Sequence, residues 1–266
     1  MQVELVAPSD VLLPYIRAYY RAVSPEPVSE GVERVDLGQI RFWLRGRGTV
    51  RFPDRHFERT PEVSVLAPAM SVRNYRAEGP AEVFGGALRP QGWAALIGVD
   101  ARKAANHVHD GAALLGPDSL EFLARLRAQT SLEGMVSEAE AYFPTKFRPV
   151  PDSHVRLIKL VHQWEAGDHP VIEDLYAAAG MSERQIGRLI NYYYGGPPKF
   201  LERKFRAMRA AARIANGENP AAVAERFYDQ PHMIRELKRF VGHTPTTLRE
   251  RLDPILRAAL TLERLD

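Results

Sequence analysis

The spacing of hydrophobic residues divides the chain into two parts. Between Val32 and Leu88, short apolar or alternating runs are separated by Gly and Pro, a pattern typical of β-strands joined by turns. Beyond residue 153, apolar residues recur at intervals of three and four, as on amphipathic helices. The pattern therefore predicts an α+β protein whose mostly-β part, with short helices, precedes an all-α part.

The expected boundaries follow from the same pattern. Three prolines lie within Pro144–Asp152, which makes this segment the candidate linker. We expect an N-terminal domain at residues 1–143, a helical domain at 153–252 and a helical tail at 253–266.

Several local elements are expected inside the first part. An amphipathic helix is predicted at Val11–Arg21, and Gly46 and Gly48 fit a hairpin turn. Further helices are expected at residues 92–98, 101–106, 119–129 and 133–142. The last two are candidates for a homodimer contact, because they are amphipathic and precede the linker.

A first helix pair is predicted around Gly180. Apolar residues from Ile172 to Ala179 form one buried stripe, and Gly180 suits a helix end. Ser182 is the expected N-cap of a second helix, Glu183–Tyr193. Its apolar face carries Ile186, Leu189, Ile190 and Tyr193, and its polar face carries Arg184, Gly187, Arg188 and Asn191. This arrangement is typical of a helix-turn-helix whose second helix enters the major groove.

A second pair follows a long basic helix at residues 198–216. A short Ala-rich helix at Pro220–Arg226 precedes the expected N-cap Asp229 and a helix at Gln230–Val241. Met233, Leu237, Phe240 and Val241 form its apolar line, whereas Gln230, His232, Arg235 and Arg239 are polar. The predicted organisation is therefore two helix-turn-helix units joined by one helix.

The charge distribution agrees with a polyanionic partner. Residues 1–152 carry 18 basic and 19 acidic side chains, whereas residues 182–213 carry eight basic and two acidic ones. A basic patch of this density is typical of nucleic-acid binding, and a solvated helix face rich in Arg is the alternative.

Residues 172–252 resemble the DNA-binding domain of the AraC/XylS family. The resemblance rests on LYAAAGMS, SERQIGRL, GGPPKF and above all YDQPHMIRELKRFVGHTP. It implies two reading helices in successive major grooves of double-stranded promoter DNA, with base-facing positions at Arg184, Gly187, Arg188, Gln230, His232 and Arg235. The family usually has Gly where this chain has Arg226, so a positive φ there would be strained.

Other positions are expected to contact DNA as well. Asn191 is a further candidate for base contact, since Asn pairs with adenine. Phosphate contacts are expected from Ser182, Lys199, Arg203, Arg206, Lys238 and Arg239. RNA polymerase is a candidate partner of such a regulator.

The first half is similar to sensory domains attached to some AraC-type regulators. This similarity rests on DLGQIRFWLRG and FGGALRPQGWAALIGVDARKAANHV. It implies a small sandwich or cupin-like barrel that binds an unknown effector, a partner protein or its twin. Candidate pocket residues are Phe42, Trp43, Tyr75, Arg89 and Trp93. The alternative is that these are core aromatics and a salt-bridged Arg.

Several functions are not expected. The chain has no Cys, which excludes disulfides, thiolate zinc sites and Cys nucleophiles. His107, His109 and Asp110 have residue types found in zinc sites, but without further spaced ligands they are more typical of a strand end with satisfied histidines. No metal, cofactor or catalytic residue is predicted. No apolar run is long enough to cross a membrane. We expect a cytoplasmic, non-enzymatic, sequence-specific transcription regulator; an adaptor or co-regulator with weakened DNA binding is the alternative.

Overall fold

The computed structural model describes residues 1–167, 170–250, 252 and 254–262. Its first half contains one antiparallel sheet, in the order β1-β2-β7-β4-β6-β8, with β3 beside β7 and β5 beside β4. The strands are β1 (Gln2–Val6), β2 (Ile16–Ser24), β3 (Val28–Glu33), β4 (Gly38–Arg51), β5 (Phe57–Arg59), β6 (Val63–Leu66), β7 (Arg73–Leu88) and β8 (Val108–Asp110).

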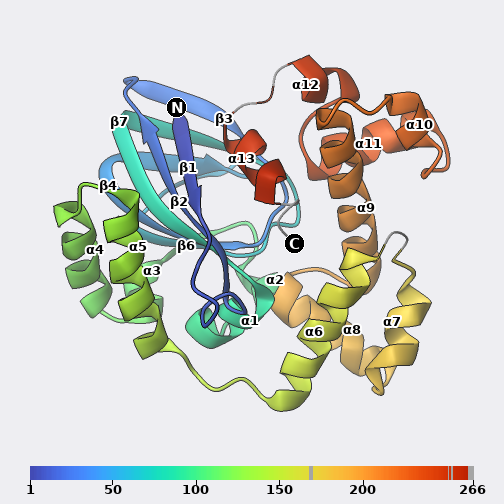
Figure 1. Ribbon diagram of the computed structural model, residues 1–266, viewed down its shortest axis with the longest axis horizontal. Coiled ribbons are helices and arrows are strands. Elements are labelled where there is room, and N and C mark those ends of the chain that lie inside the picture. Colours follow the sequence, from blue (N-terminus) through green and yellow to red (C-terminus); the bar gives the residue numbers. More distant parts are fainter. Residues whose placement is uncertain (168–169, 251, 253, 263–266) are drawn as a thin grey trace.

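The two longest strands, β4 and β7, each pair with different neighbours along their two ends, and the sheet that they join is strongly curved (Figure 1). β7 pairs with β3 along residues 73–78 and with β2 along residues 81–88. The register between β4 and β7 shifts on either side of Arg45, and Gly46 has φ +75°. Bulges of this kind bend a strand. The hairpin turn expected at Gly46 is therefore wrong, because the glycine lies in a bulge within one continuous strand.

The helix expected at Val11–Arg21 is also wrong. Only one turn forms there, in which the Ile16 amide donates to the Leu12 carbonyl over 2.9 Å. The chain then enters β2, where Tyr19 pairs with Gly86 of β7 and is fully buried. The aromatic side chains of this segment favour a strand, and pairing with β7 decides between the two structures.

Helices cover the convex face of the sheet. α4 (Asp118–Ala128) and α5 (Leu132–Tyr142) pack their apolar sides against Phe42 and Phe84 of the sheet (Figure 1). These two helices were expected, as were short helices at residues 92–98 and 101–106, where the structure has a π-helical turn at Trp93–Ile97 and α2 (Ala101–Ala104). α1 (Pro90–Gly92), directly before the π-helical turn, was not predicted. α3 (Gly111–Leu115) and a 3₁₀ turn (Phe143–Lys146) complete this half.

The second half is helical, as predicted, so the α+β fold class is confirmed. It contains α6 (Asp152–Ala166), α7 (Ile172–Ala179), α8 (Glu183–Tyr194), α9 (Pro198–Ala215), α10 (Pro220–Ala224), α11 (Gln230–Phe240), α12 (Pro245–Glu250) and α13 (Pro254–Leu262). Within the described ranges, no helix is both long and apolar enough to span a bilayer.

The two halves share a hydrophobic core. Val35, Ala69 and Ala94 of the first half belong to the same buried cluster as the helices of the second. The link between β3 and β4, residues 34–37, is central to this contact, and we call it the β3–β4 connector. The Val35 amide donates to the Phe240 carbonyl over 2.8 Å, and Arg34 reaches Met208 Sδ at 3.3 Å. Elsewhere, the Tyr192 hydroxyl donates to the Gly98 carbonyl over 2.9 Å.

The last described helix returns to the first half. α13 lies beside β1, on the side of the sheet opposite α4 and α5 (Figure 1). Leu256 is buried there. The tail expected at residues 253–266 thus includes a packed helix, while 251, 253 and 263–266 lie outside the described residues.

Two glycines of the first helix pair give a matched test of this backbone. An added Cβ would meet no atom within 4 Å at Gly180 or at Gly187, but Gly180 has φ +61° and Gly187 is helical. Gly187→Ala should raise the free energy of unfolding by about 0.5–1 kcal/mol. Gly180→Ala should lower it by about 1–2 kcal/mol. Urea unfolding measures both, and shifts in the same direction would contradict the assigned conformations.

Candidate DNA-binding surface

The start of α8 is fixed by a reciprocal cap. The Ser182 hydroxyl accepts from the Gln185 amide at 3.3 Å, and the Gln185 side chain accepts from the Ser182 amide at 3.1 Å. Both bonds satisfy amides that the first helical turn leaves unpaired. On the inner side, Ile186, Leu189, Ile190 and Tyr193 are buried. Cap and core together determine which face of α8 points outward.

The outward face of α8 is cationic. Arg184 and Arg188 are exposed one turn apart, and Gly187 lies between them with open space above its Cα. Asn191 is half-buried, and its amide nitrogen donates to the Gly187 carbonyl over 2.7 Å. Two arginines are therefore presented to solvent, whereas Asn191 is bonded to its own helix.

α11 is built in the same way. The Asp229 carboxylate accepts from the His232 amide over 2.6 Å and caps the helix. Met233, Leu237 and Phe240 are buried. Gln230, Arg235, Lys238 and Arg239 are exposed. His232 is half-buried, with its ring against that of Phe227 at a centroid distance of 5.8 Å, so it is less accessible than its neighbours.

An ion pair fixes α11 to α9. Arg203 donates to both carboxylate oxygens of Glu236, over 3.0 and 2.7 Å, and Glu236 is only 2% exposed. The hydrogen bond to Glu236 raises the pKa of Arg203. Such a two-pronged, charge-assisted pair restricts the relative orientation of the helices.

The expected phosphate-binding residues differ in their surroundings. Lys199 is exposed, as are Lys238 and Arg239. Arg206 is half-buried and lies over the Phe227 ring at 5.5 Å. Arg203 is engaged by Glu236, and Ser182 is exposed at the capped end of α8.

Two features of the second pair were not foreseen. Tyr228 is 92% exposed in the turn directly before α11. Its position beside the N-cap Asp229 was the sequence signal that could have predicted this exposure. The strain expected at Arg226 is absent, because this residue does not have a positive φ. Its amide instead donates to the Val223 carbonyl over 3.3 Å, closing a tight turn that suits any side chain.

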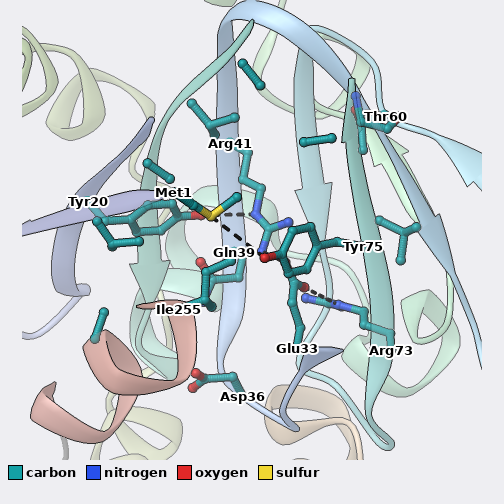
Figure 2. A pocket seen from close by; sticks show the side chains of 18 of the residues that line it. Met1, Tyr20, Glu33, Asp36, Gln39, Arg41, Thr60, Arg73, Tyr75 and Ile255 are labelled. Atoms are coloured by element: carbon teal, nitrogen blue, oxygen red, sulfur yellow. Dashed lines mark hydrogen bonds and ion pairs between the residues drawn. The ribbon is translucent and has the colours of Figure 1, made fainter. Parts of the chain in front are cut away.

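A cavity of about 140 Å³ lies on the concave side of the sheet (Figure 2). Trp43 and Tyr75 are among the residues that line it, and Ile255 and Leu256 of α13 close one side. Phe42 and Trp93 lie instead in the core on the other face. Arg89 lines a separate cleft between the two halves. The five candidate pocket residues are thus not brought together.

The floor of the cavity holds a buried charge cluster that was not predicted. Glu33 binds Arg41 and Arg73, each at 2.7 Å, and Arg41 donates to the Tyr20 hydroxyl over 3.0 Å (Figure 2). Burial raises the pKa of Glu33, but the two guanidinium groups outweigh it and hold that pKa below its ordinary value. Every second residue of β4 lines the cavity, namely Gln39, Arg41 and Trp43. This alternation, which places side chains on one face of a strand, was the sequence signal that could have predicted the cavity floor.

Comparison with known proteins finds structural similarity only. No protein-family model and no curated protein matches the chain. Among solved structures, it is similar to ToxT from Vibrio cholerae, with a TM-score of 0.46 and 9% identity over 98% of this chain and 99% of that one. It is also similar to unsaturated fatty acid-bound ToxT from Vibrio cholerae strain SCE256, with a TM-score of 0.45 and 10% identity over 86% of this chain and 94% of that one. The AraC-like transcriptional activator CuxR gives 0.34 and 15%, with coverages of 79% and 87%.

The buried cluster predicts a pH effect on stability. Because the folded-state pKa of Glu33 lies below its ordinary value of 4.5, its stabilisation is present above pH 4.5 and is lost as pH falls through the folded pKa. At pH 7, Glu33→Gln should lower the free energy of unfolding by about 3 kcal/mol, since it leaves buried arginines without their partner. The difference from wild type should shrink below pH 4.5.

Urea unfolding across pH measures this difference. The matched control is Glu62→Gln, which removes a carboxylate that pairs with Arg127 at the surface and should change little. If the difference in free energy of unfolding between wild type and Glu33→Gln stayed constant down to acid pH, the lowered pKa assigned to Glu33 would be wrong.

Proposed function

We propose that this chain is a transcription regulator of the AraC/XylS type that binds duplex DNA through α8 and α11. One observation carries the proposal: each helix starts at a side-chain N-cap, follows a short helix, and exposes arginines on the face opposite its core. The two pairs, α7–α8 and α10–α11, then act as helix-turn-helix units. We assign residues 1–143 to an effector domain, 144–152 to a linker and 153–252 to DNA binding.

The side chains suit distinct kinds of DNA contact. Arg184 and Arg188 on α8, and Gln230 and Arg235 on α11, are placed to read base edges, because Arg can bind guanine through two hydrogen bonds. Lys199, Lys238 and Arg239 are suited to phosphates, which supply much of the affinity. Successive major grooves on one DNA face lie about 34 Å apart, so the proposed site spans two helical turns.

The first test is the affinity of purified protein for a duplex selected from a genomic fragment library. Arg188→Ala and Arg235→Ala should each cost about 1–3 kcal/mol of binding free energy on that duplex. Lys238→Ala should weaken binding to all duplexes by a similar factor, whatever their sequence. The exposed Arg45→Ala, in the first half, is the matched control and should leave the affinity unchanged.

Fluorescence titration over a range of salt concentration completes this test. The three phosphate contacts proposed above would lower the affinity by about 40-fold between 50 and 200 mM salt. A flat salt response, or normal binding by both Arg variants, would contradict the proposal. Failure to enrich any genomic fragment would favour the adaptor alternative.

We further propose that the cavity binds a small effector. Apolar side chains surround a few convergent polar groups, as in typical ligand sites. Arg17, Arg34, Arg41, Arg73 and Arg76 line it against Glu33 and Asp36, which favours an apolar molecule with one anionic group. A cavity of about 150 Å³ holds a molecule of the size of benzene.

The β3–β4 connector supplies a route from this cavity to DNA. Arg34 and Asp36 line the cavity, while their neighbour Val35 bonds to the last residue of α11. Burial raises the pKa of Asp36, but Arg34 and, after it, Lys204 of α9 help to hold that pKa below its ordinary value. A ligand that shifts the connector would therefore act on α9 and α11 together.

A thermal-shift series of small aromatic carboxylic acids and their matched alcohols tests the cavity. The acids should raise the midpoint of wild-type unfolding more than the alcohols do. Ala77→Leu, which fills the cavity, should abolish the shift without abolishing DNA binding. Ala124→Leu, on the exposed side of α4, is the control. Equal shifts in wild type and Ala77→Leu would place the ligand elsewhere.

A further inference from the structure

Three potential metal ligands meet at the edge of the sheet, away from both surfaces considered above. His56 and Glu58 come from the turn and strand around β5, and His107 directly precedes β8, 49 residues after Glu58. Glu58 Oε1 lies 3.3 Å from His56 Nε2 and 2.6 Å from His107 Nδ1. One ligand atom from each residue lies within 4.8 Å of the other two.

These separations suit a four-coordinate ion. Bonds of about 2.1 Å in a tetrahedron place neighbouring donor atoms about 3.4 Å apart. The separation of 3.3 Å between His56 and Glu58 is close to this value, and the separation of 2.6 Å between Glu58 and His107 would have to lengthen by about 1 Å to reach it. His56 Nε2 is shielded from solvent and forms no hydrogen bond, although it faces Glu58. A buried nitrogen in that state is an available metal ligand.

The surrounding groups hold these ligands as a metal site requires. The Asp54 carboxylate binds His56 Nδ1, so Nε2 is the ring nitrogen that remains to ligate a metal ion. The same carboxylate also accepts a hydrogen bond from the His56 amide. The His56 ring stacks on Phe52 at a centroid distance of 4.8 Å. The Val108 amide donates to Glu58 Oε2 over 2.6 Å, so Oε1 points to the histidines. A carboxylate behind a ligating His is a recurrent arrangement in zinc proteins.

His107 had been grouped with His109 and Asp110 in the sequence. The rings of His107 and His109 do lie near each other, at a centroid distance of 6.2 Å, but His109 and Asp110 bond to other groups. His109 Nε2 lies 2.8 Å from the Ala104 carbonyl, and the Asp110 carboxylate caps α3 by accepting from the Ala112 amide. The partners of His107 come from the distant β5 region instead. Sequence spacing alone therefore could not reveal this cluster.

We propose that His56, Glu58 and His107 bind one Zn²⁺-class ion, with solvent as the fourth ligand. Two imidazoles and a carboxylate suit Zn²⁺, Co²⁺ or Ni²⁺, whereas Mg²⁺ and Ca²⁺ prefer oxygen ligands throughout. The His107 side chain is 57% exposed, so the site opens to solvent and the ion can enter. The bound ion ties β5 to β8 and so stabilises the folded chain.

Binding of Zn²⁺ to chelator-treated, full-length protein tests the site. Isothermal titration should give one ion per chain, and saturating Zn²⁺ should raise the midpoint of thermal unfolding. Co²⁺ should give the intense visible absorption of a four-coordinate ion. His56→Gln and His107→Gln should each lower the Zn²⁺ affinity by at least about tenfold, and Asp54→Asn by about 10–100-fold. Circular dichroism confirms that each variant is folded.

His109→Gln is the matched control, since it changes a neighbouring histidine outside the cluster and should leave Zn²⁺ affinity unchanged. Absence of binding to folded wild-type protein overturns the proposal. Normal affinity in either His56→Gln or His107→Gln, or an equal loss in His109→Gln, overturns the three-ligand assignment.

Discussion

The hydrogen bond from the Val35 amide to the Phe240 carbonyl joins the two halves of the molecule at a place where both residues are fully buried. Val35 is fully buried, and its neighbours Arg34 and Asp36 both line the cavity. Arg34 also contacts Met208 of α9. Phe240 ends α11 and packs against Phe200 near the start of α9. The orientation of the second helix pair is therefore defined relative to the sheet as well as to its own helices.

The basic residues of the helical half fall into two groups with different physical roles. Arg203 is neutralised by a buried carboxylate, and Lys204 is itself buried beside the first half. These charges fix helices in place. Arg184, Arg188, Lys199 and Arg235 project from exposed positions and contribute to the field around the molecule. A count of positive charge along the chain combines both groups, and only their burial separates them.

The helical half was predictable from sequence because its signals are local. Ser182, Gly180 and Asp229 mark helix ends through hydrogen bonds or backbone conformations that span a few residues. The β half was harder, because Tyr19 and Gly46 take their conformations from strands distant in the chain. The same reason explains the candidate sites. Reading faces follow from helical periodicity, whereas Glu33 meets Arg73, and His56 meets His107, only through pairing between distant segments.

The position of α13 on the sheet has a consequence for the order in which the protein matures. This helix follows α12 in the chain, yet Leu256 completes a wall of the cavity in the first half. During synthesis, the sheet leaves the ribosome with that wall missing. The cavity acquires its final shape only after every helix from α6 to α12 has been made. A nascent chain halted before α13 would display an open apolar concavity, a surface of the kind that chaperones bind.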